Sequence, residues 1–288
     1  MRIILLGASG QIGKEIYEVL KANPSNEVIG TSRKSIKGYL RFDPFKDDWA
    51  VLGKADVLIN SVGQIEESSD SSFDKVHCEL TLLILKNRPV IGNPRVIQIS
   101  VIGADKDSPV EFLSTKGLAD DALMQEENTI VVRASIVCTP ETMMVKKMKM
   151  LYDMSRYSLG YALVPAGFAS HKIQPVMVKD LAVIISRICL ADYPSGLIHV
   201  VGPHEIGYRQ LLEILYKTRG RTLKLIEIPK ALTDFAVRKI VSRIFPSIIN
   251  EQQYHLLFQD NVADKSEGEK FLGSPLSSTI EFWQNEFK

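Results

Sequence analysis

The sequence has little excess charge, few cysteines and no long apolar run, and each shortage excludes a class of protein. Lys and Arg total 35 against 34 Asp and Glu, so the net charge of +1 gives no sign of a nucleic-acid-binding surface. Only three cysteines are present, Cys78, Cys138 and Cys189, and none lies in a closely spaced pair. We therefore expect reduced, mostly buried thiols of a cytoplasmic protein and no disulfide framework.

No apolar run is long enough to span a bilayer, and the five histidines show no metal-ligand spacing. Met1 leads directly into the first predicted strand, so we expect no signal peptide. With 288 residues, 45% hydrophobic and 24% charged, the composition is that of an ordinary globular protein. The length suits one large domain, or a domain with a smaller lobe.

The strongest pattern is at the start of the chain, MRIILLGASGQIG. Arg2 to Leu6 is a short apolar run, and Gly7, Gly10 and Gly13 follow at intervals of three. Apolar residues then recur at helical spacing. A strand, a glycine turn and a helix in this order favour dinucleotide binding, because glycine permits both the tight turn and close approach of a pyrophosphate. Free amides at the helix start attract the phosphates. A glycine-rich turn without a ligand is the weaker alternative.

The residues after the second predicted strand, Glu27 to Thr31, favour NADP over NAD. Folds that select NAD usually place an acid there to bond the ribose hydroxyls. This chain has Ser32, Arg33 and Lys34, whose hydroxyl and cations suit a 2′-phosphate, although they also suit a solvated loop. Asp43 follows a short third strand, where it can reach the adenine amino group or cap the turn beside it. The sequence does not separate those two roles.

Strands and helices alternate through the first half of the chain. Further strands are predicted at residues 55–60, 95–100 and 128–135, and helices at 73–86 and from 116. This alternation predicts a Rossmann-type, doubly wound parallel sheet. After Cys138 the pattern changes. We therefore divide the chain into a cofactor-binding core, residues 1–139, and a smaller, mostly helical lobe, residues 140–288, interleaved with late elements of the main sheet.

The second half offers few chemical motifs. Residues 143–154 are predicted as a basic, Met-rich helix, residues 163–170 as a loop, and Asp180 as the N-cap of a helix over 181–190. Residues 235–245 form a second basic, amphipathic segment. Such segments can contact a partner or a membrane surface, but a lobe helix with a solvated basic face is the simpler interpretation.

Taken together, these segments resemble the atypical, or extended, short-chain dehydrogenase/reductases. The ordered set comprises GASGQIG from Gly7, QISVIGAD from Gln98, STKGLADDAL from Ser114, VVRASIV from Val131, QPVMVKDLA from Gln174 and HVVGP from His199. Within that family the chain resembles the branch of the nucleotide-binding accessory subunit of respiratory complex I, with NmrA-like proteins as neighbours. The C-terminal segment HLLFQDNVADKSEGEKFLG also matches this branch, so the resemblance covers nearly the whole length.

The resemblance implies NADP contacts at the matching positions. They are Gly7, Ser9, Gly10, Gln11, Ile12, Ser32, Arg33, Ser61, Val62, Lys116, Ala134, Ser135 and Ile136, to which the turn and strand patterns add Gly13 and Asp43. In the family's chemistry a tyrosine is the acid/base, a lysine four residues later lowers its pKa and holds the ribose, and an upstream serine polarises the substrate. Matching Lys116 to that lysine puts Ser100 at the serine position and Phe112 at the tyrosine position.

A phenyl ring cannot transfer a proton, so Phe112 leaves the acid/base role open. Other candidate donors are Ser114, Thr115, Tyr152, Tyr157, Tyr161 and His171, and Tyr157 and Tyr161 rank first because they precede the loop expected over the cofactor. Epimerases of this fold need the tyrosine too. Two hypotheses remain: an NADP-dependent oxidoreductase of small carbonyls or alkenes using Ser100, Lys116 and Tyr161, and a non-catalytic NADP-binding redox sensor or assembly component. The sequence slightly favours the oxidoreductase.

Overall fold

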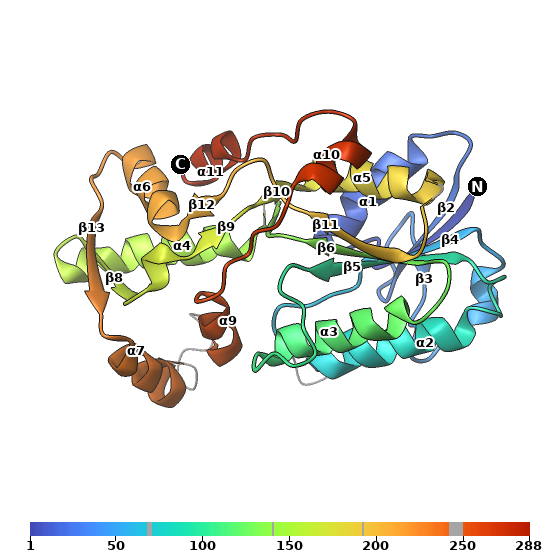
Figure 1. The fold of residues 1–288 in the computed structure, drawn as a ribbon, viewed down its shortest axis with the longest axis horizontal. Coiled ribbons are helices and arrows are strands. Elements are labelled where there is room, and N and C mark those ends of the chain that lie inside the picture. Colours follow the sequence, from blue (N-terminus) through green and yellow to red (C-terminus); the bar gives the residue numbers. More distant parts are fainter. Residues whose placement is uncertain (68–70, 140, 192, 242–249) are drawn as a thin grey trace.

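A seven-stranded, wholly parallel sheet forms the centre of one half of the molecule in this computed structural model, which describes residues 1–67, 71–139, 141–191, 193–241 and 250–288 (Figure 1). The strand order is β11-β6-β5-β4-β1-β2-β3. The bounds are β1 Arg2–Leu6, β2 Glu27–Ser32, β3 Leu40–Arg41, β4 Val57–Asn60, β5 Arg95–Val101, β6 Thr129–Ala134 and β11 Gly196–Val200. The order reverses between β1 and β4, which confirms the predicted Rossmann-type fold.

Helices cover both faces of this sheet (Figure 1). One face carries α1 Gln11–Lys21, α5 Val178–Leu190 and α10 Ser266–Leu272, and the other carries α2 Leu80–Asn87 and α3 Glu111–Met124. Alternate residues of β1 enter the two resulting cores, with Ile3 and Leu5 on the α1 side and Ile4 and Leu6 on the α2 side. Burial on both faces is why this strand reads as an uninterrupted apolar run.

The smaller lobe has its own apolar core, built around Tyr152, Tyr216 and Trp283. Its main elements are α4 Met143–Met154, β8 Tyr161–Pro165, α6 Tyr208–Thr218, β13 Lys224–Ile228, α7 Lys230–Ala236, α9 Glu251–Leu256 and α11 Ile280–Glu286. Shorter elements are η1 Trp49–Leu52, η2 Lys75–Glu79, β7 Val137–Cys138, η3 Ser155–Ser158, η4 Phe168–Ser170, β9 Lys172–Ile173, β10 Val176–Met177, β12 Ile206–Gly207 and η5 Val237–Val241. Strand β8 pairs in parallel with β13 alone.

Four local expectations need correction. Residues 163–165 belong to β8, not to a loop, because they pair with β13. Met177 caps α5, while Asp180 lies in its first turn and accepts hydrogen bonds from the amide and hydroxyl of Ser277 at 2.6 and 2.9 Å. The helix expected from Lys116 begins earlier, at Glu111. The helix expected over 73–86 is present but irregular, since it is π-helical over Lys75–Glu79 before it continues as α2. Of the predicted segment 235–245, residues 242–245 lie outside the described residues.

Candidate functional site

The turn between β1 and α1 has the shape that a dinucleotide phosphate needs. Gly7 adopts φ +77°, a conformation that side chains disfavour. A Cβ on Gly13 would lie 2.2 Å from the carbonyl oxygen of Gly7 and 2.8 Å from Oγ of Ser61. Gly10 caps α1 without any side-chain hydrogen bond to the first amides. The glycines therefore keep the helix start close to the strand and leave its amides open, so the turn fits a bound anion.

Side chains at the end of β4 complete this turn. A Cβ on Gly7 would lie 3.1 Å from Oγ of Ser61 and 3.0 Å from Cγ2 of Val62. Ser61 donates to the carbonyl oxygen of Leu6 at 2.7 Å, and the amide of Val62 donates to Asn60 at 3.1 Å. Two segments about fifty residues apart are thus fixed together at the carboxyl edge of the sheet.

Gln11, the first residue of α1, is tied to the start of the smaller lobe. Its Oε1 accepts from Thr139 at 2.7 Å, and its Nε2 donates to Glu141 at 3.1 Å. The Gln11 side chain is therefore held beside α1, and a carboxylate lies next to the predicted phosphate position.

The end of β2 presents two exposed cations beside a buried serine. The hydroxyls of Ser9 and Ser32 lie 3.1 Å apart, and the Lys34 amide donates to Ser32 at 3.2 Å. Arg33 and Lys34 are exposed. Asp43 accepts from the amide of Phe45 at 3.1 Å, which is the turn-capping arrangement. The strand end therefore brings a hydroxyl and two cations next to the glycine turn.

Lys116 lies on α3 and faces the same sheet edge. Its ammonium donates to the carbonyl oxygen of Ile99 at 3.3 Å and lies 3.6 Å from where a Cβ of Gly63 would be. The residue is 4% exposed, and burial lowers the pKa of Lys116 to about 8 while the charge of Asp120 opposes that shift. Among the described residues it has no ion-pair partner within 4 Å. A buried ammonium in this position suits a ligand with hydroxyl acceptors.

Ser100 is bonded to Asp120, the carboxylate whose charge acts on Lys116. It is 1% exposed, and its hydroxyl donates to the buried carboxylate of Asp120 at 2.9 Å. Arg133 donates to the same carboxylate oxygen at 2.8 Å. Burial raises the pKa of Asp120, and the bonds from Arg133 and Ser100 oppose that rise. The serine therefore belongs to a buried polar cluster between α3 and β6.

Phe112, one helical turn before Lys116, lies in an aromatic cluster. Its ring is 5.6 Å from the rings of both Phe73 and His77, and Phe112 is 8% exposed. Nδ1 of His77 lies 2.9 Å from Oγ1 of Thr115, and burial together with the charge of Lys116 lowers the pKa of His77 to about 2. Leu256 of α9, from the smaller lobe, packs against this cluster. The position of the family tyrosine is therefore apolar and covered.

Asn261 is a residue of this edge that the sequence interpretation left without a role. Its side chain accepts from the hydroxyl of Ser135 and from the amide of Ile136, the latter at 3.2 Å, and donates to the Ile102 carbonyl oxygen at 3.3 Å. Its backbone oxygen accepts from the Gln174 amide at 3.0 Å. Two predicted cofactor positions, Ser135 and Ile136, are thus bonded to the C-terminal segment. The only sequence signal was the motif HLLFQDNVADK, which contains this asparagine.

Comparison with known proteins finds similarity over nearly the whole chain. No family model matches it. It is 29% identical to the Arabidopsis thaliana protein "NADH dehydrogenase (ubiquinone) 1 alpha subcomplex subunit 9, mitochondrial", over 90% of this chain and 70% of that relative. A nucleoside-diphosphate-sugar epimerase from Staphylococcus aureus has the same fold, with a TM-score of 0.76, 15% identity and coverage of 99% and 100% of the two chains. In sequence the chain is thus similar to the Arabidopsis subunit, and in fold it is similar to the atypical, extended short-chain dehydrogenase/reductases.

A second solved member of this fold is a human epimerase family protein, determined with NADPH. Its TM-score is 0.70 at 17% identity, and the match covers 100% of this chain and 99% of that one. The chain thus spans a complete extended dehydrogenase/reductase fold, including the smaller lobe. The positions that match the family's lysine and serine are both buried, Lys116 at 4% and Ser100 at 1% exposed, and the position that matches its tyrosine is Phe112.

The candidate replacements for the tyrosine lie in varied surroundings. Tyr161 is on β8 in the smaller lobe, with the Lys224 ammonium 5.6 Å from its ring centre, whereas the β1–α1 turn belongs to the other half of the molecule, where Gln11 meets the start of the lobe (Figure 1). Tyr157 is 94% exposed nearby. Tyr152 is buried in the lobe core. His171 binds Asp260 at 3.2 Å. None of these positions favours proton transfer at the glycine turn.

Ser114 and Thr115, on α3 near Lys116, bond within their own helix. The Ser114 hydroxyl donates to the carbonyl oxygen of Glu111 at 3.1 Å, and the Thr115 hydroxyl donates to the same oxygen at 2.8 Å. Both protons are therefore directed along the helix and away from an incoming substrate.

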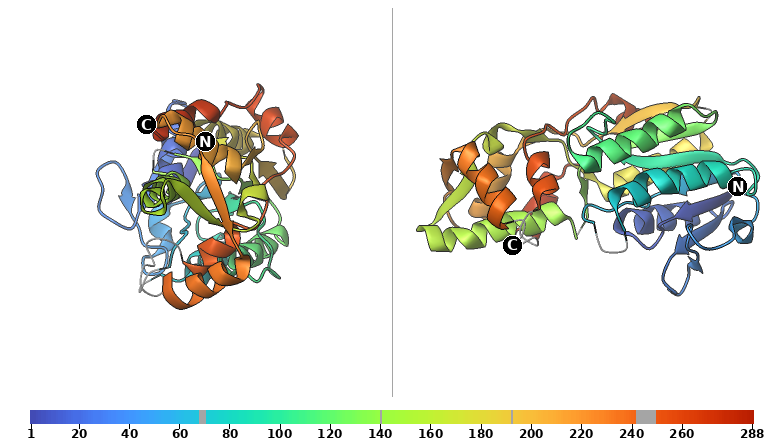
Figure 2. Two further views of the ribbon diagram at one scale, coloured as in Figure 1. Left: turned by 90° about the vertical axis from the view of Figure 1, so that its left-hand side faces the viewer. Right: turned by 90° about the horizontal axis from the view of Figure 1, so that it is seen from below.

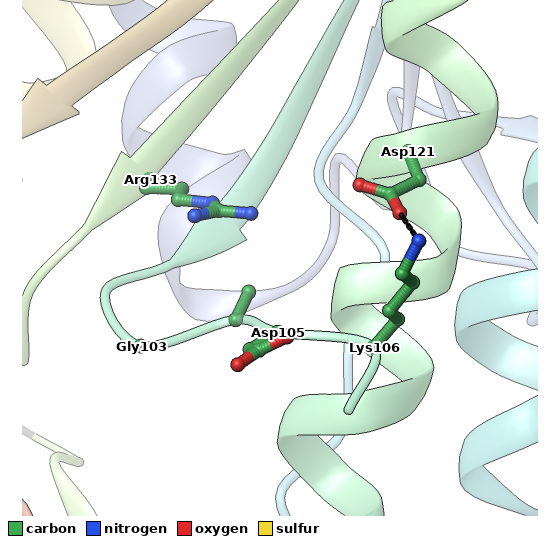
Figure 3. Close-up of a pocket in the computed structure, with 6 residues that line it drawn as sticks. Gly103, Asp105, Lys106, Asp121 and Arg133 are labelled. Atoms are coloured by element: carbon green, nitrogen blue, oxygen red, sulfur yellow. Dashed lines mark ion pairs between the residues drawn. The ribbon is translucent and has the colours of Figure 1, made fainter. Parts of the chain in front are cut away.

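An open depression of 540 Å³ lies beside α3 and β6 (Figure 3). The loop from Gly103 to Lys106 lines it, together with Asp121 and Arg133, and Lys106 pairs with Asp121 at 3.4 Å. None of the predicted cofactor positions lines it. Its two cations and two carboxylates balance, so its charge favours neither an anion nor a cation.

Proposed function

We propose that this protein binds NADP(H) across the β1–α1 turn and the end of β2. The open amides of α1 would hold the pyrophosphate, Ser32, Arg33 and Lys34 the 2′-phosphate, and Lys116 the ribose beside the nicotinamide. When bound, NADPH supplies a hydride. The observation that carries the proposal is the Gly7–Gly13 contact, since a side chain at Gly13 would clash with the Gly7 backbone and force the start of α1 away from the turn.

We further propose that the protein holds this cofactor without the serine–tyrosine chemistry of its family. The supporting observation is Phe112, which packs against Phe73 and His77 and is covered by Leu256. The Ser100 hydroxyl is committed to Asp120. The Arabidopsis relative is named as a subunit of an NADH dehydrogenase, which agrees with a role as a cofactor-binding component of an assembly.

Calorimetric titration of the cofactor-free protein with NADPH and NADH tests the binding proposal. We expect NADPH to bind at least tenfold more tightly, a difference of about 1.4 kcal/mol. Arg33→Ala should remove most of that preference and leave NADH binding unchanged. Lys86→Ala, an exposed cation in the last turn of α2, is the matched control. Equal affinity for the two cofactors would contradict the role of Arg33, and no binding of either would contradict the proposal itself.

An NADP-dependent oxidoreductase is the second candidate, and Lys116 is the observation that favours it. A buried ammonium with a pKa of about 8 can give up a proton near neutral pH. NADPH consumption with a panel of small aldehydes, ketones and activated alkenes tests this function. Turnover that Lys116→Met abolishes would support catalysis. No turnover by a preparation that binds NADPH tightly would support the holding role.

A further inference from the structure

The far end of the smaller lobe exposes large apolar side chains on a projecting turn. Tyr157 is 94% exposed and Leu159 is 89% exposed, and both lie where α4 and η3 lead into β8. We call residues 154–163 the lobe tip. The lobe tip lies at the left-hand extreme of the molecule in Figure 1 and also in the right-hand view of Figure 2.

The backbone holds Leu159 outward at some cost. This residue has φ +54°, a left-handed conformation that is rare for a bulky side chain. The Gly160 amide closes the turn by donating to the carbonyl oxygen of Ser155 at 2.8 Å. A leucine that is both strained and solvated gains nothing for folding, which favours a role outside the fold.

The exposed apolar surface continues from the tip onto the β8–β13 pair. Tyr161 and Leu163 are 36% and 42% exposed and lie on one face of β8. The parallel register sets Leu163 opposite Ile226, which is 43% exposed. The apolar surface is therefore a feature of several elements and not of one stray side chain.

Cations lie near this apolar surface. The Lys224 ammonium lies 5.6 Å from the ring centre of Tyr161, and the guanidinium groups of Arg219 and Arg221 lie 4.8 and 5.6 Å from the ring centre of Tyr152, which is buried beneath. Asp153 lies 3.9 Å from Arg219 and 4.0 Å from Arg156. Arg156 is in the tip itself. Residues 153–163 and 219–224 together hold four cations and one carboxylate, Asp153, although the whole chain has a net charge of only +1.

We propose that the lobe tip docks on an anionic lipid bilayer. Exposed aromatic and aliphatic side chains in segments that also carry an excess of Lys and Arg match the layers of such a surface, with apolar groups among the acyl chains and cations at the headgroups. A protein partner fits less well, because a stable interface buries about 800 Å² on each side and a projecting turn offers only a few side chains.

The geometry is that of a peripheral contact. No helix in the described ranges is long and apolar enough to cross a membrane. The β1–α1 turn lies in the other half of the molecule (Figure 1), so a docked tip would leave the proposed cofactor site uncovered. Membrane docking and cofactor binding are therefore independent properties, and each can fail without the other.

Co-sedimentation of the full chain with lipid vesicles tests the proposal. The vesicles contain either phosphatidylcholine alone or equal parts of phosphatidylcholine and phosphatidylglycerol. We expect binding to the anionic vesicles only, weakening as salt is added. Leu159→Asn should weaken it roughly tenfold, because asparagine tolerates the left-handed backbone but removes the apolar side chain. Tyr157→Gln should have a similar effect, and Arg221→Gln a smaller one.

Leu190→Gln is the matched control, since Leu190 is 64% exposed at the end of α5 in the other half of the molecule. It should bind vesicles like the parent chain. Each variant is also followed by circular dichroism through thermal unfolding, so that loss of vesicle binding in a misfolded protein is recognised whether or not the chain binds NADPH. Failure of the parent chain to sediment with anionic vesicles would overturn the proposal, as would equal binding by the Leu159 and Leu190 variants.

Discussion

At the scale of single residues, the charge of Lys116 has opposite effects on the stability of the fold and on the proposed binding of a ribose. Folding buries it with one carbonyl acceptor and no ion-pair partner among the described residues, which costs free energy. Its position at the sheet edge is useful only if it stays protonated to donate to a ribose. The lowered pKa of about 8 is the measure of that conflict. Natural proteins commonly accept such a cost at a binding site.

Because of this conflict, replacing Lys116 should raise the stability of the fold and weaken the binding of NADPH. Lys116→Met keeps the length of the side chain and removes the charge, so we expect the free energy of unfolding at pH 7 to rise by roughly 1–3 kcal/mol. NADPH binding should weaken about tenfold or more. Urea denaturation and calorimetry on the same preparation measure the two quantities. A Lys116→Met protein that is less stable than the parent would show that the ammonium is compensated in the fold.

The pH dependence follows from the same shift. Below pH 8 both the folded and the unfolded chain carry the Lys116 proton, and the folded state bears the full cost of the buried charge. As pH rises from about 8 toward 10.5, the folded chain releases this proton first, so its stability increases. This increase should be missing in Lys116→Met, which separates it from the titration of other groups.

At the scale of elements, the segment around Asn261 joins the two halves of the molecule. Asp260 binds the amide of Lys172 at 2.9 Å in the smaller lobe, while Asn261 binds Ser135 and Ile136 at the end of β6. The conformation of this β6 end therefore depends on the C-terminal segment. If Ser135 and Ile136 contact the nicotinamide end of the cofactor, Asn261 positions that contact.

Titrations with NADPH and with its adenosine part alone distinguish a positioning role of Asn261 from a general loss of stability. Asn261→Ala should weaken NADPH binding roughly tenfold. It should change little for adenosine 2′,5′-bisphosphate, which lacks the nicotinamide. Asp260→Ala, which removes only lobe-side bonds, is the control and should leave both affinities unchanged. Equal losses for the two ligands in Asn261→Ala would point to a structural effect on the whole site.

Elements with local signals were predictable, and elements defined by distant contacts were not. The β1–α1 turn, the Met-rich α4 and the parallel sheet follow from periodicity and glycine spacing. Strand β8 was missed at residues 163–165, because it depends on β13, some sixty residues away. Ser100 was assigned from the family resemblance, which gave no sign that its hydroxyl is bonded to Asp120 on α3.

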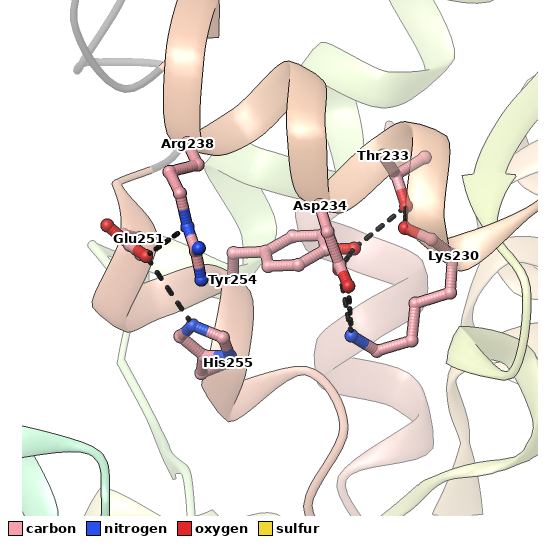
Figure 4. A network of polar contacts seen from close by, with 7 residues as sticks. All are labelled: Lys230, Thr233, Asp234, Arg238, Glu251, Tyr254 and His255. Carbon is pink, nitrogen blue, oxygen red and sulfur yellow. Dashed lines mark hydrogen bonds and ion pairs between the residues drawn. The ribbon is translucent and has the colours of Figure 1, made fainter.

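The network that joins α7 to α9 shows the same limit (Figure 4). Tyr254 donates to Asp234 at 2.7 Å, and Lys230 donates to the same carboxylate at 2.8 Å. Burial, and to a smaller extent the neighbouring Asp234, raises the pKa of Tyr254 to about 12. No spacing in the sequence connects Tyr254 with residues twenty positions earlier, so only the folded chain reveals this contact.

At the scale of the whole molecule, the boundary at residue 139 does not separate two folding units. Helix α5 and strand β11 lie after that boundary, yet α5 packs on α1 and β11 pairs with β6. Leu181, Ile184 and Ile185 of α5 are fully buried in the same core as Ile16 and Leu20 of α1. A fragment ending at residue 139 would therefore expose one face of its sheet to water.

We expect a fragment of residues 1–139 to lack a cooperative unfolding transition and to bind no NADPH, whereas the full chain shows both. The physical reason is that half of the apolar cover over β1, β5 and β6 comes from residues beyond the cut. Thermal denaturation followed by near-ultraviolet circular dichroism, with NADPH titration of each sample, measures the difference. A fragment that unfolds cooperatively and binds NADPH would show that the first half is an independent domain and that α5 and β11 only decorate it.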